Sequence, residues 1–257
     1  MNFNDFSYSN YEKLLNNLLS TRINLCFRDF IKGDLESNYL ILRHDVDFSP
    51  TAALRMAKLE AHLGVKATYF VIFSSSYYNL FGEEYVEFPR RLAEMGHEVG
   101  LHYDVKFMKI ATHHGDLLEI LNKEIDILSF LSGTEIKSIA MHNPSSTGTD
   151  PFQETNFINA YNQKFTTQIS YFSDSCGAWR DNFVEHFQKN NFPMRIQLLI
   201  HPLFWRASSL SRWETLDDYT RIRYEKLLKE NQSLREMWRN HSGVIQHERR
   251  QQIFRNG

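Results

Sequence analysis

The sequence predicts an α/β fold built on a mostly parallel sheet, and three observations indicate it. Short apolar runs typical of buried strands alternate with helical patterns along the 257 residues. Hydrophobic residues make up 42% of the chain and charged residues 23%, which is the composition of an ordinary globular protein. No internal repeat and no linker-like segment divides the chain. Strand and helix in alternation favour either a barrel or a doubly wound sheet.

The predicted strands are apolar runs bounded by helical or turn segments. They span residues 40–48, 65–73, 97–104, 136–143, 168–173 and 195–201. The helical patterns lie between them, and one is marked by apolar residues at spacings of three and four, namely Leu118, Leu121, Ile125 and Leu128. Gly133 is predicted to end that helix. A second helix is predicted to begin at Ser49-Pro50, a capping residue followed by proline, and to end at Gly64.

The end of the chain predicts a long, charged helix over residues 213–239, followed by a polar segment. We expect a single domain over residues 1–257, with a barrel core at about 38–210 and a helical extension at about 211–257. This extension is expected to pack either across the outside of the domain or against a second subunit. A homo-oligomer formed through the C-terminal helix is therefore one of the predicted partnerships.

Composition excludes several function classes. The formal net charge of -2 gives no whole-molecule attraction to nucleic acid or to an anionic membrane. No run approaches the roughly 18 apolar residues that a membrane span needs, and the first residues lack the pattern of a signal peptide. We therefore expect a cytoplasmic protein. Its two cysteines, Cys26 and Cys176, are too few for a disulfide framework or a structural zinc site.

Side-chain alternation places polar residues on one face of several strands. In residues 40–47, Arg43, Asp45 and Asp47 share one face, while apolar neighbours take the other. By the same rule His102, His142 and His201 occupy the less apolar face at the carboxyl ends of three other strands. Active sites of parallel α/β folds lie at this edge. One such histidine is usually structural, but four converging strands predict a functional site.

The chemistry of this cluster favours a metal. Asp45 and Asp47 are two residues apart, and two carboxylates that close repel each other unless a cation or a proton separates them. Carboxylate and imidazole ligands favour Zn²⁺, with Co²⁺, Ni²⁺, Fe²⁺ or Mn²⁺ as alternatives, over Ca²⁺ or Mg²⁺. An open coordination position could polarise an amide carbonyl and activate water, and His201 could protonate the leaving nitrogen. A helix cap and a surface salt bridge are the alternative roles of the two aspartates, because Ser49-Pro50 follows them.

Five short segments resemble the motifs of the polysaccharide deacetylase family, also called the NodB-homology or carbohydrate esterase 4-like family. Residues 42–47, Leu-Arg-His-Asp-Val-Asp, resemble the first motif, and residues 96–102 resemble the approach to the second. Met-His-Asn-Pro at 141–144 is similar to the third motif, which usually reads Arg-x-Pro. Ser-Asp-Ser at 173–175 with Trp179 resembles the fourth motif, and Leu-Leu-Ile-His-Pro at 198–202 resembles the fifth.

This resemblance implies a distorted (β/α)7 barrel that removes N-acetyl groups from sugars. It implies that Asp45 is the catalytic base, that Asp47 and His102 bind the metal, and that His201 is the general acid. The family's second metal histidine would fall where this chain has Lys106. We therefore expect His142 to be the third ligand, with Asp104 as the alternative.

Four further residues are expected to contact the substrate or the ligands: Arg43, Asp174, Trp179 and Trp205. Among aromatic residues near strand ends, Tyr69, Tyr103, Trp179 and Trp205 are candidates to stack on a sugar ring, with packing in the core as the alternative.

Without a recognisable export signal, the chain resembles the short family members that serve the cytosolic assembly of surface polysaccharides. The predicted substrate is thus an N-acetylated amino sugar on a nucleotide or a lipid carrier. A hydrolase of a small or cyclic amide is one alternative. The other is a catalytically inactive sugar-binding barrel, which would bind no metal at stoichiometric levels.

Overall fold

The protein was analysed as a computed structural model that describes residues 5–32, 36–113, 115–180, 182–189, 191–208 and 210–255. Its contacts divide the chain into two units, residues 1–211 and 212–257. The second unit consists of one helix, α9 (Arg212–Arg255). No helix within the described part of the chain is long and apolar enough to cross a membrane.

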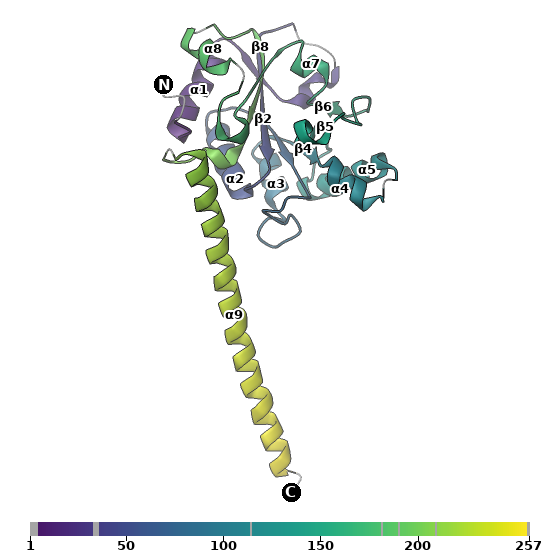
Figure 1. The fold of residues 1–257 in the computed structure, drawn as a ribbon, viewed down its shortest axis with the longest axis vertical. Coiled ribbons are helices and arrows are strands. Elements are labelled where there is room, and N and C mark those ends of the chain that lie inside the picture. Colours follow the sequence, from purple (N-terminus) through teal and green to yellow (C-terminus); the bar gives the residue numbers. More distant parts are fainter. Residues whose placement is uncertain are drawn as a thin grey trace. The chain divides into compact units, whose positions relative to one another are not determined.

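The first unit is built on a parallel sheet in the order β6-β5-β4-β3-β2-β8-β7, with β1 paired to the start of β2 (Figure 1). The strands are β1 (Ile23–Leu25), β2 (Tyr39–Val46), β3 (Thr68–Val71), β4 (Glu98–Tyr103), β5 (Ser138–Met141), β6 (Ile158–Asn159), β7 (Ser170–Ser173) and β8 (Arg195–Ile200). They form a half-barrel surrounded by helices. This is the distorted (β/α)7 barrel that the sequence predicted.

Helices and short 3₁₀ turns connect these strands. They are α1 (Tyr8–Leu19), η1 (Phe27–Lys32), α2 (Pro50–His62), α3 (Phe88–Glu94), α4 (Val105–Ala111), α5 (Leu117–Ser132), α6 (Pro144–Thr147), α7 (Gln163–Thr166), η2 (Ser175–Gly177), α8 (Phe183–Lys189) and η3 (Pro202–Phe204). The predicted helix signals are confirmed. The Ser49 hydroxyl accepts the Ala52 N–H at the start of α2, and Gly133 ends α5 with a φ of 70°.

The six predicted strands are all present, within three residues at each end. The sequence prediction missed β1 and β6, which have three and two residues. Helix α9 covers the predicted helix at 213–239 and continues to Arg255, within the predicted helical extension. The residues from 240 onward are polar, and a solvated helix accepts such residues.

Side-chain alternation separates the two faces of β2. Tyr39 and Ile41 point into the barrel and join an apolar cluster with Phe70, Phe165 and other side chains. A Cβ added to Gly100 of β4 would lie 2.5 Å from the Phe70 ring, so this inward position has no room for a larger residue. Because the strands are parallel, their polar carboxyl ends meet at one edge of the barrel, as predicted.

Candidate metal and catalytic site

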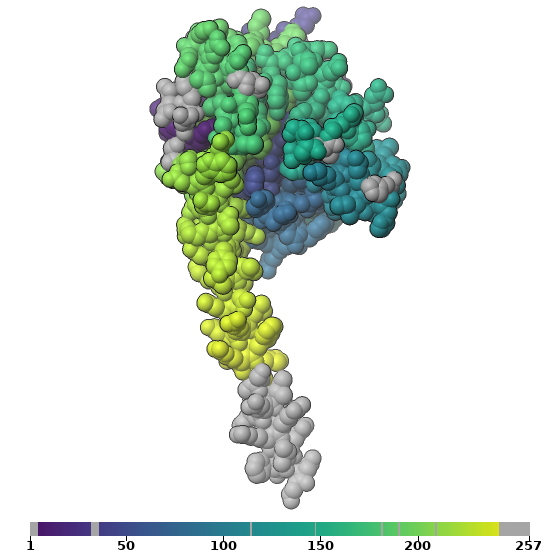
Figure 2. Space-filling model, in the orientation of Figure 1, coloured from purple at the N-terminus to yellow at the C-terminus, as the bar shows by residue number. Residues whose placement is uncertain are grey.

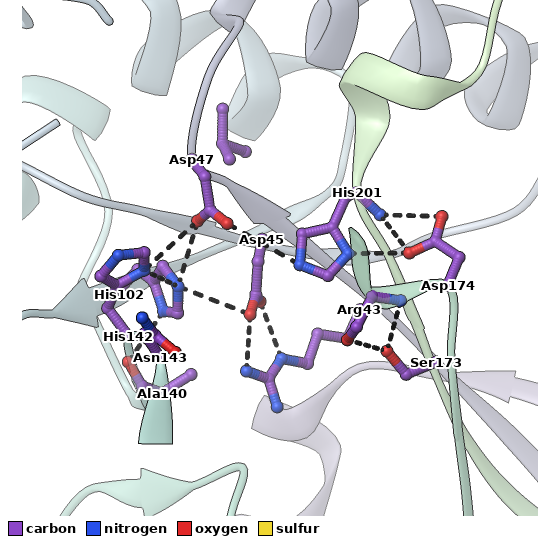
Figure 3. A network of polar contacts seen from close by, with 12 residues as sticks. Arg43, Asp45, Asp47, His102, Ala140, His142, Asn143, Ser173, Asp174 and His201 are labelled. Carbon is purple, nitrogen blue, oxygen red and sulfur yellow. Dashed lines mark hydrogen bonds and ion pairs between the residues drawn. The ribbon is translucent and has the colours of Figure 1, made fainter. Parts of the chain in front are cut away.

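Side chains from four strands meet at the carboxyl edge of the barrel (Figure 3). Asp45 lies in β2 and Asp47 directly follows it, whereas His102 lies in β4. His142 follows β5, and His201 follows β8. The structure thus brings together all five residues that were predicted to bind metal or to react.

Asp47, His102 and His142 form a triangle of potential ligand atoms. Asp47 Oδ1 lies 3.2 Å from His102 Nε2 and 3.6 Å from His142 Nδ1, and the two ring nitrogens are 3.2 Å apart. A tetrahedral zinc ion with bonds of about 2.0–2.1 Å holds its ligand atoms about 3.3–3.5 Å apart. The spacing of these three atoms therefore fits one divalent transition-metal ion.

The backbone fixes which nitrogen of His102 faces this triangle. His102 Nδ1 lies 2.9 Å from the carbonyl oxygen of Ala140 in the neighbouring strand β5. Since a carbonyl can only accept, Nδ1 carries the hydrogen, and Nε2 of the neutral ring presents a lone pair to the triangle. This arrangement is the usual support of a metal-binding histidine.

Asp47 provides a second sign that a cation fits. Its Oδ1 is buried and has no hydrogen-bond partner among the residues that the structure describes. An unpaired buried carboxylate oxygen costs free energy, because water no longer solvates it. A cation between Asp47 and the two imidazoles would supply the missing partner.

Asp45 is held beside this triangle by Arg43. Arg43 Nε donates to Asp45 Oδ1 and Nη2 to Oδ2, both at 2.8 Å, and both side chains are buried. Burial alone would raise the pKa of Asp45, but the charge and hydrogen bonds of Arg43 hold it below its usual value. The guanidinium is fixed in turn by Gln197 Oε1 at 3.3 Å and by the Tyr161 ring, whose centroid is 4.4 Å away. Asp45 is therefore an ionised carboxylate in one orientation.

His201 approaches from the other side of the aspartates, with its Nε2 3.7 Å from Asp47 Oδ2. Its Nδ1 lies 2.7 Å from Asp174 Oδ1, and Asp174 also accepts the His201 backbone N–H and, at 2.8 Å, the Trp205 indole N–H. Burial would lower the pKa of His201, but the hydrogen bond and charge of Asp174 outweigh it and raise the pKa to about 9. At neutral pH this imidazolium carries a proton on Nε2.

Asp104, the alternative metal ligand, has a different role. Its Oδ1 accepts the backbone N–H groups of Lys106 and Phe107 and caps α4, and its Oδ2 accepts the Ser74 hydroxyl at 3.2 Å. The carboxylate is thus occupied by the start of a helix. Lys106, where a second metal histidine was expected, lies in the first turn of α4 with an exposed side chain. The structure assembles the triangle with His142 instead.

For three of the four aromatic candidates the structure supports packing in the core, the alternative to stacking on a sugar. Tyr69 and Tyr103 are fully buried, and Trp205 is 1% exposed with its indole N–H committed to Asp174. Trp179 is half-buried and stacks on Phe183, with ring centroids 3.8 Å apart. Three of these rings therefore support the fold or Asp174 and have no face free for a sugar.

Three contributors were missed in the sequence. The Ala140 carbonyl orients His102, but every residue has a carbonyl and no sequence signal marks this one. Gln197 supports Arg43, and its inward position in β8 was a usable signal. The Ser75 hydroxyl donates to the Asp47 carbonyl oxygen at 2.8 Å and ties the loop after β3 to the segment that carries Asp47.

Comparisons with known proteins give matches among solved structures. No family model and no curated protein matches the sequence. The polysaccharide deacetylase Bc1974 from Bacillus cereus is 15% identical, over 63% of this chain and 78% of that protein, with a TM-score of 0.44. The peptidoglycan deacetylase PdaC from Bacillus subtilis is 17% identical, over 80% and 99%, with a TM-score of 0.45. A family 4 carbohydrate esterase pseudoenzyme from Bacillus anthracis is 14% identical, over 76% and 63%, with a TM-score of 0.34.

The chain is similar to solved polysaccharide deacetylases. These matches carry the names of the family that the five sequence motifs resemble.

Proposed function

We propose that this protein is a divalent-metal-dependent hydrolase that removes the acetyl group from an N-acetylated amino sugar. The observation that carries the proposal is the triangle of Asp47, His102 and His142, with an ionised Asp45 and a protonated His201 beside it. Acid and base of opposite protonation state at one metal-binding edge suit the hydrolysis of an amide.

Asp47, His102 and His142 would hold the metal. Two imidazole ligands and one carboxylate ligand favour zinc. When bound, such an ion polarises an acyl oxygen and lowers the pKa of a bound water. His102 is prepared for this role by the Ala140 carbonyl, and Asp47 by an Oδ1 without a hydrogen-bond partner in the described part of the chain.

Asp45 is the proposed base. It takes a proton from the water that attacks the acyl carbon, and the bidentate contact with Arg43 keeps its carboxylate oriented during the transfer. A buried arginine that cannot lose its proton also ensures that Asp45 is ionised before reaction.

His201 is the proposed acid. As the bond between the acyl carbon and the nitrogen breaks, Nε2 donates its proton to the leaving amine, so acetate and the free amine are the products. Asp174 binds Nδ1–H and stabilises the imidazolium, which leaves the Nε2 proton directed towards Asp47. The position of His201 Nε2 beside Asp47 supports its role as a general acid.

The nature of the sugar comes from the motifs alone. The resemblance to short family members supports a nucleotide-linked or lipid-linked precursor of a surface polysaccharide. The cytoplasmic location and the carrier remain predictions from the sequence.

The direct test is acetate release by purified protein loaded separately with Zn²⁺, Co²⁺ and Mn²⁺. Substrates would be N-acetylated monosaccharides, nucleotide-linked N-acetyl amino sugars and small linear and cyclic amides. We expect acetate only from N-acetyl sugars, and none from the Asp45→Asn variant under the same loading. Cleavage of the cyclic amides alone would make the protein a small-amide hydrolase. Sugar binding without metal or acetate release would make it an inactive barrel.

A further inference from the structure

Helix α9 carries large apolar side chains that are exposed in the single chain. Tyr224, Leu227 and Trp238 are each 61–62% exposed, and Leu234 is 45% exposed. Figure 2 shows side chains standing out from α9 along the stretch coloured yellow. Most of the stability of a helix in a protein comes from packing an apolar face, and these residues offer such a face.

The apolar residues recur with the spacing of a coiled coil. Tyr224, Leu227, Asn231, Leu234 and Trp238 follow one another at intervals of three and four residues. They occupy the a and d positions of successive heptads, which lie along one stripe of the helix. The stripe is widened by Leu228 and Met237, which take the flanking e and g positions.

We propose that α9 pairs in parallel with α9 of a second copy of this chain over residues 224–241. The charges that flank the stripe identify the partner. Glu230 occupies a g position, and Arg235, five residues later, occupies the next e position. In a parallel two-stranded coiled coil, a g residue faces the following e residue of the other helix, so Glu230 meets Arg235 of the second copy, twice by symmetry.

The same charges oppose the antiparallel arrangement. In an antiparallel pair, e positions face e positions, which brings Arg235 towards Arg221 of the second copy. The g positions also face g positions, which brings the two Glu230 side chains together.

Asn231 adds a separate argument. A single asparagine at an a position lowers stability but fixes the register of two parallel strands, because the two amides can bond across the axis.

The first experiment measures the mass of the full-length protein in solution by light scattering after size exclusion. We expect the mass of two chains, each 30.4 kDa, for the natural sequence. Leu234→Glu should give the mass of one chain. Ile222→Glu is the matched control, because Ile222 is 48% exposed but lies at an f position opposite the stripe. This control should remain dimeric. A monomeric natural protein, or equal dissociation by both variants, would overturn the proposal.

The second experiment tests orientation through cysteine cross-linking in a Cys176→Ser background, where the remaining Cys26 is buried. Leu227→Cys should give a covalent dimer on mild oxidation, since equivalent d positions adjoin in a parallel pair. Lys229→Cys, at an f position, should not. Charge exchange provides a check that does not require an introduced thiol: Glu230→Arg should weaken the dimer at least several-fold, and adding Arg235→Glu should restore it. Cross-linking at both sites, or no rescue, would contradict the parallel arrangement.

Discussion

Carboxylates and histidines lie close together on both faces of β2, but their roles on the two faces differ. Outside the barrel, Glu60 of α2 is fully buried and accepts three contacts, from the hydroxyls of Tyr11 and Tyr69 and from His44 Nε2. Inside, Asp47 also lies among histidines, but its Oδ1 has no hydrogen-bond partner within the described chain. One carboxylate is satisfied by the fold, and the other remains available to a ligand.

This difference shows that the residue types in a cluster do not by themselves identify a functional site. Both clusters contain a carboxylate and two histidines close by, because His97 also lies 3.8 Å from Glu60. The two clusters differ in whether hydrogen-bond donors or hydrogen-bond acceptors face the carboxylate. Tyrosine hydroxyls donate to Glu60, whereas lone pairs from Asp47 and His102 face one another at the barrel edge. Substitutions in the two clusters should therefore affect different measurements.

The largest effect is expected from Asp47→Ala, which removes one corner of the metal triangle. Bound zinc should fall from one equivalent to near zero, and acetate release should fall with it. The cooperative unfolding transition should persist, because Asp47 is outside the apolar core. Metal analysis by mass spectrometry and circular dichroism on the same sample would check both. Full metal content in this variant would exclude Asp47 as a ligand.

His201→Ala should keep the metal and lose turnover by about 10²- to 10⁴-fold, the usual worth of a general acid. In the natural protein the acid form is lost as pH rises through about 9, so activity should decline there and the variant should lack that decline. Because the folded-state pKa is raised, the stability from the contact with Asp174 is present below about 6.5 and is lost as pH rises through about 9. An unchanged alkaline limb in the variant would assign the acid elsewhere.

Glu60→Ala should show the reverse pattern on the other face of β2. Removing one partner of a buried ionic cluster costs about 3–5 kcal/mol of the free energy of unfolding. Zinc content should stay at one equivalent in the folded fraction. Urea unfolding measures the loss, and Glu119→Ala is a suitable control, since its pair with Lys123 is 61% exposed and should be worth under about 1 kcal/mol. Loss of metal in the Glu60 variant would show that the two faces are coupled.

A smaller effect distinguishes His142 from Asp104. His142→Ala should weaken metal binding by about 100-fold. Loss of a residue that only supports a ligand weakens metal binding by up to about 100-fold, and loss of a ligand should cost at least as much. Asp104→Ala should leave affinity nearly unchanged and instead cost about 1 kcal/mol of stability through the lost cap of α4. Competition with a zinc chelator gives the affinities. A larger loss of affinity in the Asp104 variant would reverse the assignment.

Strand alternation made most of the candidate site predictable. It grouped Asp45 with Asp47 and placed His102, His142 and His201 at the same edge, where the structure finds them. The same rule, applied to aromatic residues, separates Tyr103 from the site. Tyr103 is adjacent to His102 in β4 and therefore points away from the site.

Other features needed three-dimensional information. The role of Asp104 had a local signal, because an aspartate directly before a helix is a common cap, but the start of α4 was not predicted. The two-residue strand β6 is too short for any periodicity to appear in the sequence. Trp205 contacts Asp174 across 31 residues of chain, and such a pairing depends on how β7 and β8 lie side by side.

The contact between His102 and the Ala140 carbonyl has a consequence for mutagenesis. Every amino acid at position 140 carries the same carbonyl, so no replacement of the side chain removes the acceptor that sets the tautomer of His102. A saturation scan would register position 140 only through the volume of its side chain, which is fully buried in the barrel. Small residues there would score as neutral while the backbone continued to orient the histidine. The role of the Ala140 carbonyl therefore cannot be detected by replacing the side chain at this position.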